Sequence, residues 1–145
     1  MKIMVKEVGK PLAVVDCDER YFTDCVQKYI GKTRVEKVYL NGADFIMGVD
    51  ENGYMKELPV NFYLRTKSIT YPIQGIAGTV VFVRCKPCTF QMLEEEIYDL
   101  EVSDVTDEDI HIVECYLDKD YQDWCRFIKS YTDDDNQDCA VKKGE

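Results

Sequence analysis

The chain of 145 residues has one histidine and no apolar run long enough to cross a bilayer. A single histidine leaves little basis for a Ser-His-Asp triad or a metal site built from several histidines. A membrane-spanning helix needs about 20 consecutive apolar residues. Gly75 and Gly78 lack the lysine and the helix that follow a phosphate-binding loop. We therefore predict a protein that is not an enzyme, has no cofactor and does not span a membrane.

The N-terminus also lacks the apolar core of a signal peptide, because charged residues interrupt it every few positions. The chain has seven cysteines, an odd number. An odd count in a chain without an export signal is typical of reduced thiols. These features predict a cytoplasmic protein.

Acidic residues are concentrated in the last third of the chain. Between residues 94 and 138 there are 17 Asp and Glu but three basic residues, whereas residues 1–93 carry a small basic excess. The sequence pI of about 4.6 argues against direct binding to nucleic acid or to an anionic membrane. The 46% hydrophobic content is too high for a disordered chain. The charge block therefore predicts a folded module whose acidic surface selects what approaches it.

Turn signals divide the first two thirds of the chain into short extended segments. A hairpin is expected around the turn at residues 9–11, and an amphipathic helix over Asp18–Ile30 with Gly31 after it. Asn-Gly pairs at 41–42 and 52–53 predict a β-meander. Its expected strands are Arg34–Leu40, Ala43–Val49 and Tyr54–Leu58. The segment Pro59–Gln74 is expected to be less regular, because prolines limit ladder pairing.

Later segments predict one buried strand and then helices. Gly78–Arg84 has no polar alternation, as in a central strand buried on both faces. A short helix is expected over Phe90–Leu100, and Thr106 is the expected N-cap of a helix that runs to Leu117. A last helix is expected from about Asp120 to Tyr131, with Tyr121, Trp124, Cys125, Ile128 and Tyr131 buried.

Together these elements predict an α+β fold. An antiparallel β-meander sheet is packed by one N-terminal amphipathic helix and followed by an acidic C-terminal helical segment. We expect residues 1–93 to form the sheet core and residues 94–132 an acidic helical extension packed on it. Residues 133–145 are expected to form a flexible tail.

Several segments resemble a family of small proteins of unknown function encoded in phages, plasmids and integrative elements of Gram-positive gut bacteria. The resemblance rests on KIMVKEVGKPLAVVD, NGYMKELPVN, GTVVFV and the later DLEVSDVTDEDI. The matching positions are Asn52, Gly53, Leu58, Pro59, Asn61, Gly78 and Thr79. The resemblance implies an accessory protein of a mobile element and implies no catalytic residue. Residues 85–96 depart from the family pattern as an insertion.

Asn61 is the one polar position in this match without an obvious turn role. We expect its side chain to satisfy backbone groups where the meander ends, in preference to contacting a ligand.

Cys85 and Cys88 form a CxxC motif between a predicted strand and a possible helix. A helix N-terminus lowers a thiol pKa, so a redox dithiol is one interpretation. Zinc is another, with His111 and Cys115 as further ligands because residues four apart share a helix face. The third interpretation, which we favour, is that the cysteines are structural and that the chain binds no metal.

Six acidic residues are expected on the outer side of the last helices: Glu108, Asp109, Glu114, Asp118, Asp120 and Asp123. The leading hypothesis is a non-enzymatic protein-binding module that contacts a protein partner through this acidic face. A narrower alternative is a DNA mimic, in which carboxylates imitate phosphates and inhibit a nucleic-acid-binding enzyme. A second alternative is a zinc or dithiol protein that uses Cys85 and Cys88.

Overall fold

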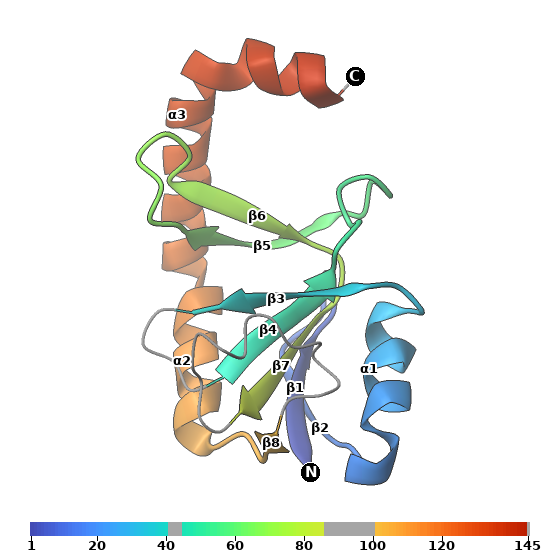
Figure 1. Cartoon of the computed structure of the whole chain (residues 1–145). Helices are drawn as coiled ribbons and strands as arrows, with labels where there is room; N and C mark the ends of the chain where they lie inside the picture. Colours follow the sequence, from blue (N-terminus) through green and yellow to red (C-terminus); the bar gives the residue numbers. More distant parts are fainter. Residues whose placement is uncertain (41–44, 86–100, 145) are drawn as a thin grey trace.

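The computed structural model describes residues 1–40, 45–85 and 101–144. Within them, antiparallel strands form two sheets, and the α+β class expected from the sequence is confirmed (Figure 1). The larger sheet has the order β2-β1-β7-β4-β3, with β8 beside β7, and the smaller sheet pairs β5 with β6. The strands are β1 (Lys2–Lys6), β2 (Ala13–Asp16), β3 (Val35–Tyr39), β4 (Phe45–Asp50), β5 (Val60–Arg65), β6 (Ile73–Ala77), β7 (Val80–Cys85) and β8 (Val102–Ser103). The helices are α1 (Phe22–Ile30), α2 (Asp107–Leu117) and α3 (Lys119–Gly144).

Strand β7 occupies the centre of the larger sheet, as its unbroken apolar sequence predicted. It pairs with β1 on one side and β4 on the other, with Phe82 opposite both Met4 and Met47. Its residues are buried except for Arg84, which is partly exposed. A strand that is covered on both faces needs no polar alternation.

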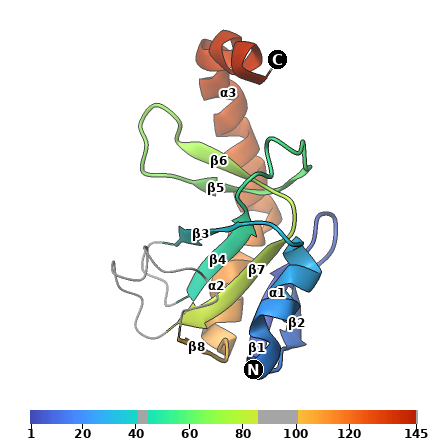
Figure 2. The same ribbon diagram turned by 45° about the vertical axis from the view of Figure 1, so that its right-hand side comes forward.

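Alternate residues of the larger sheet enter two separate cores. Ile3, Val81 and Val83 pack with α1 on one face. Met4, Phe45 and Phe82 face the other way, toward α2 and the smaller sheet. Figures 1 and 2 show α1 and α2 on opposite sides of the larger sheet. The period of two along each strand thus produces a layered molecule.

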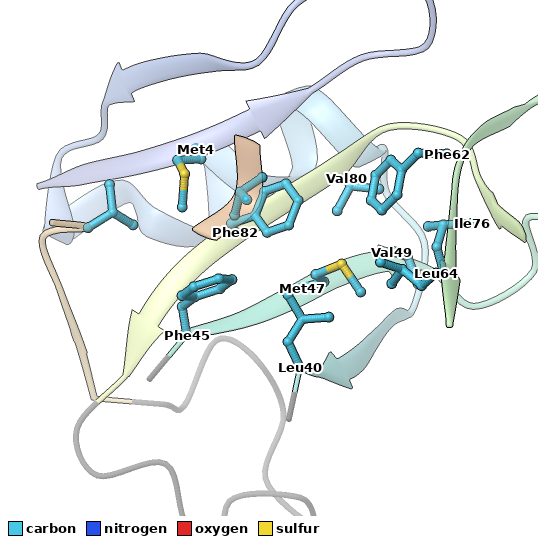
Figure 3. Close-up of a cluster of buried hydrophobic side chains, with 12 residues drawn as sticks. Met4, Leu40, Phe45, Met47, Val49, Phe62, Leu64, Ile76, Val80 and Phe82 are labelled. Atoms are coloured by element: carbon cyan, nitrogen blue, oxygen red, sulfur yellow. The ribbon is translucent and has the colours of Figure 1, made fainter. Parts of the chain in front are cut away.

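Aromatic rings join the smaller sheet to the larger one (Figure 3). Phe62 of β5 stacks on Phe82 with ring centroids 6.4 Å apart, and Phe45 meets Phe82 edge-on at 6.1 Å. Leu64 and Ile76 point into the same cluster. Each such ring pair stabilises the fold by about 1 kcal/mol beyond the free energy gained by burying the apolar surface of the rings.

The smaller sheet corrects two expectations. Residues 54–57, expected to begin a strand, form turns, and Glu57 has a positive φ of 56°. The segment expected to be irregular, Pro59–Gln74, holds all of β5 and the first two residues of β6. Pro59 and Pro72 each stand just before a strand, where the missing N–H does not interrupt the ladder.

Helix α1 follows a 3-10 turn over Glu19–Tyr21. The Asp18 side chain caps that turn through the Arg20 amide at 3.0 Å, so the α-helix itself begins four residues later than expected. Phe22 and Val26 are buried, whereas Tyr21 is exposed. Gly31 ends the helix with φ 105°, a conformation that favours glycine.

Helix α3 extends to Gly144, beyond the end expected near Tyr131. Its packed side also differs from the expected stripe, because Trp124 and Tyr131 are 42% and 72% exposed. Gln122 is buried in their place, at 6% exposure. The side of the helix that contacts β5 is centred on Cys125, which puts Gln122 inward and Trp124 at the flank. No helix within the described residues is both long enough and apolar enough to span a membrane.

Candidate binding surface on the C-terminal helices

The N-terminus of α2 is a complete capping box. The Thr106 hydroxyl accepts from the Asp109 amide at 3.1 Å, and the Asp109 carboxylate accepts from the Thr106 amide at 2.9 Å. Acidic residues in the first turn also complement the positive end of the helix dipole. The helix start that the sequence predicted at Thr106 is therefore confirmed, and so is its end at Leu117.

Only one side of α2 faces solvent. Val113 is buried at 1% exposure, and Ile110 and Leu117 pack against the same core. The opposite side carries Asp107, Glu108, His111, Glu114 and Cys115, all exposed. This division follows from the helical period, which places residues three and four apart on one face.

Asp109, expected among the outward acids, is buried at 3% exposure. Both of its carboxylate oxygens accept from Arg84 Nη1, at 2.8 and 2.9 Å. Arg84 extends from β7, so this ion pair fixes the start of α2 to the central strand. A buried carboxylate needs such a partner to offset its lost hydration. Asp109 is therefore a structural residue and no part of an exposed acidic face.

Asp123 is exposed but paired. Its carboxylate accepts from Lys119 at 2.6 Å and from Arg126 at 3.1 Å, all on α3. The hydrogen bond from Lys119 is the main cause that lowers the pKa of Asp123. Pairs at this spacing on an exposed helix contribute little stability, and here they neutralise part of the acidic character.

Four of the six expected acids remain as an exposed acidic group: Glu108, Glu114, Asp118 and Asp120. All four are exposed, and the ion pairs found among the described residues involve none of them. Asp118 joins the two helices, and its carboxylate accepts from the Asp120 amide at 3.1 Å. We call these four residues the outer acidic surface.

An open hollow of about 370 Å³ lies on this surface, lined by His111, Glu114, Cys115 and Asp118. His111 Nε2 and Cys115 Sγ are 3.7 Å apart, as expected for residues four apart on one helix. Within the described residues, no group of three or more His, Cys, Asp and Glu side chains is placed to hold a metal ion. The hollow offers carboxylates with an imidazole and a thiol, a set suited to a cationic group.

The structure separates Cys85 from His111 and Cys115, the two further ligands expected for a zinc site. Cys85 is buried at 1% exposure in the core under α1, on the opposite face of the sheet from α2. It is thus not brought together with His111 and Cys115. Cys88 lies outside the described residues, as does the helix expected over Phe90–Leu100, so the CxxC motif stays a prediction.

Two side chains of α3 bond to the edge of β5. The Gln122 amide accepts from the Tyr63 N–H at 2.8 Å and donates to the Tyr63 carbonyl at 2.9 Å and the Tyr116 carbonyl at 2.6 Å. The Tyr121 hydroxyl accepts from the Arg65 N–H at 3.1 Å. These bonds pair backbone groups on the edge of β5 that a neighbouring strand would otherwise pair. The structural role of Gln122 was not predicted from the sequence. The signal that could have indicated it is the position of Gln122 four residues after Asp118 and three residues before Cys125.

Next to the outer acidic surface, α3 exposes a row of aromatic rings. Trp124, Phe127 and Tyr131 are spaced by three and four residues, and Phe127 stacks on Tyr131 at 6.4 Å. The Arg65 guanidinium lies 5.9 Å from the centre of the Trp124 ring. Aromatic side chains and arginine are enriched at the centres of protein interfaces.

Asn61 has the structural role expected of it. Its amide donates to the Lys6 carbonyl at 2.7 Å and to the Gly78 carbonyl at 2.9 Å, and its oxygen accepts from Lys6 Nζ at 3.1 Å. These bonds join β1, β5 and the turn before β7. Gly78 has φ +79°, and an added Cβ would lie 2.9 Å from Leu58 Cδ1. Positions that carried the family resemblance thus meet in one structural junction.

The family model described as Domain of unknown function (DUF3846) matches residues 1–108. The chain belongs to this family. The DUF3846 match covers the strands, α1 and the first two residues of α2. Most of the outer acidic surface and all of α3 therefore follow the DUF3846 region. Comparisons with curated proteins and with solved structures found no match.

Proposed function

We propose that this protein is a non-enzymatic binding module that presents its outer acidic surface to a basic region of a protein partner. The observation that supports this proposal most directly is the exposure of Glu108, Glu114, Asp118 and Asp120 without an ion-pair partner among the described residues. Carboxylates in such a group attract a basic partner and increase its association rate. The exposed rings of Trp124 and Phe127 supply apolar area beside them.

We further propose that the protein acts in the cytoplasm as an accessory of a mobile element, in line with the family resemblance. The segment after residue 108, which carries most of the outer acidic surface, would set the choice of partner. The family region would then serve as the scaffold that positions α2 through Arg84 and Asp109.

The test begins with crosslinking capture at low salt, comparing the wild type with a variant carrying Glu108→Gln, Glu114→Gln and Asp118→Asn. A matched control neutralises acids on the other side of the molecule, with Asp16→Asn, Glu19→Gln and Asp24→Asn, all at exposed positions. Affinity of the captured partner is then measured at low and high salt. We expect the first variant to lose at least tenfold in affinity and the control to retain it. Equal losses in both variants, or an affinity independent of salt, would contradict the proposal.

The DNA-mimic hypothesis is a narrower form of the same proposal. It requires that duplex DNA compete with this protein for the captured partner. A partner that has no affinity for DNA, or that binds DNA and this protein together, would leave only the general form.

A further inference from the structure

The N-terminal hairpin and α1 bring two thiols together, away from the outer acidic surface. Cys17 directly follows β2 and is 3% exposed, whereas Cys25 lies in α1 and is half-buried. Both are free thiols that pack in the core under α1. Burial first, and the neighbouring Cys25 thiol second, raise the pKa of Cys17 to about 12. Both thiols therefore belong to one core cluster and influence each other in the folded chain.

Both elements that carry these thiols are held in place. The Cys17 amide donates to the Met1 carbonyl at 2.6 Å, and the Met1 ammonium donates to the Cys17 carbonyl at 2.8 Å. Phe22 and Val26 anchor α1 in the same core. Proximity of two thiols on fixed elements favours an intramolecular reaction over one between molecules.

We propose that Cys17 and Cys25 form a dithiol site, oxidised to an intramolecular disulfide by small-molecule disulfides such as oxidised glutathione. Cys25 is the more accessible thiol and reacts first. Its thiolate attacks one sulfur of oxidised glutathione, the S–S bond breaks, and one glutathione leaves and takes up a proton. Cys17 then loses its proton and attacks the Cys25 sulfur, which releases the second glutathione. The two thiols lose two electrons and two protons, and oxidised glutathione gains both.

The disulfide would tie the end of β2 to α1. Such a bond restricts the unfolded chain and raises the melting temperature. The high pKa of Cys17 makes the second step slow near neutral pH, because little of this thiol is ionised. The site would therefore remain reduced in a reducing compartment and close under sustained oxidation.

The test uses the full chain incubated with oxidised glutathione, then digested with trypsin without reduction and analysed by mass spectrometry. Trypsin cleaves after Arg20, which lies between the two cysteines. We expect one cross-linked species that contains both peptides and separates on reduction. The melting temperature should rise by roughly 5–10 °C and fall again when the bond is reduced.

Two variants serve as controls. Cys25→Ala should abolish both the cross-link and the temperature shift. Cys115→Ser should retain both, because Cys115 is exposed on α2, across the sheet from this site. A stable glutathione adduct on Cys25 beside a reduced Cys17, or a Cys17 cross-link to any other cysteine, would overturn the proposal. Peptide mapping of the wild type gives this answer whether or not a variant folds.

Discussion

The inner and outer sides of α2 carry the same residue types with opposite roles. Asp109 is buried against Arg84 and completes the capping box, whereas Glu108, its neighbour in sequence, faces solvent without an ion pair among the described residues. Adjacent positions on a helix are about 100° apart, so one position decides whether a carboxylate supports the fold or remains available to a partner. Acidic composition alone therefore overstates the surface available for recognition.

Helix α3 shows the same contrast with uncharged residues. Gln122 lies on the inner side and bonds to the backbone of β5, whereas Phe127 lies on the outer side and is 64% exposed. The polar residue is thus the buried one and the aromatic residue the exposed one. This reversal indicates that the backbone groups of an edge strand needed a partner, which an amide supplies and an apolar side chain does not.

Replacing Asp109 should have the largest effect on stability. Asp109→Ala removes both bonds to Arg84 and one half of the capping box, so we expect a loss of about 3 kcal/mol in the free energy of unfolding. Urea denaturation measures it. Glu108→Ala is the matched control on the outer side and should change stability by less than about 0.5 kcal/mol. Similar losses in the free energy of unfolding for the two variants would contradict the difference between the inner and outer sides of α2.

Gln122→Ala should have the next largest effect. It leaves the N–H and C=O of Tyr63 without the bonds that Gln122 provides, for an expected loss of about 2 kcal/mol. The Tyr63 amide should exchange its hydrogen faster in the variant, because this N–H loses its acceptor on α3. Ser130→Ala, at an exposed position of the same helix, is the control and should leave that amide unchanged.

Asp50 extends the comparison to a buried carboxylate in the sheet. Burial raises its pKa, but hydrogen bonds from Lys56, the Asn52 amide and Thr33 outweigh it, and the net pKa is lowered. A lowered folded-state pKa gives stability that is present above the unfolded value, about 3.9, and is lost as pH falls through the folded value. Asp50→Asn should therefore flatten the decline in unfolding free energy below about pH 4. Parallel curves for wild type and variant there would contradict this assignment.

Neutralising the outer acids should have the smallest effect on stability. The triple variant with Glu108→Gln, Glu114→Gln and Asp118→Asn should unfold within about 0.5 kcal/mol of the wild type, because Asn retains the acceptor of Asp118. The same variant should lose binding to a basic partner. A large loss of stability would show that these residues belong to the fold and not to a recognition surface.

Local signals in the sequence were sufficient for some elements. Thr106 followed by three acidic residues marked the start of α2, and the uninterrupted apolar run of β7 marked a central strand. Both features depend on neighbouring residues, so the sequence contains them directly. The structural role of Asn61 was also predicted from the sequence, because this polar residue had no obvious role in a turn.

Only the tertiary structure decided which acids are buried and where the second sheet lies. The burial of Asp109 depends on Arg84, 25 positions earlier, and the burial of Gln122 depends on the edge of β5, 59 positions earlier. The strands after Pro59 and Pro72 are likewise stabilised by packing on Phe82 and by α3. Composition and local periodicity established an acidic, helical C-terminal region by themselves. Contacts between distant segments then determined which of its side chains the fold uses, because burial and partner choice depend on what lies opposite each position.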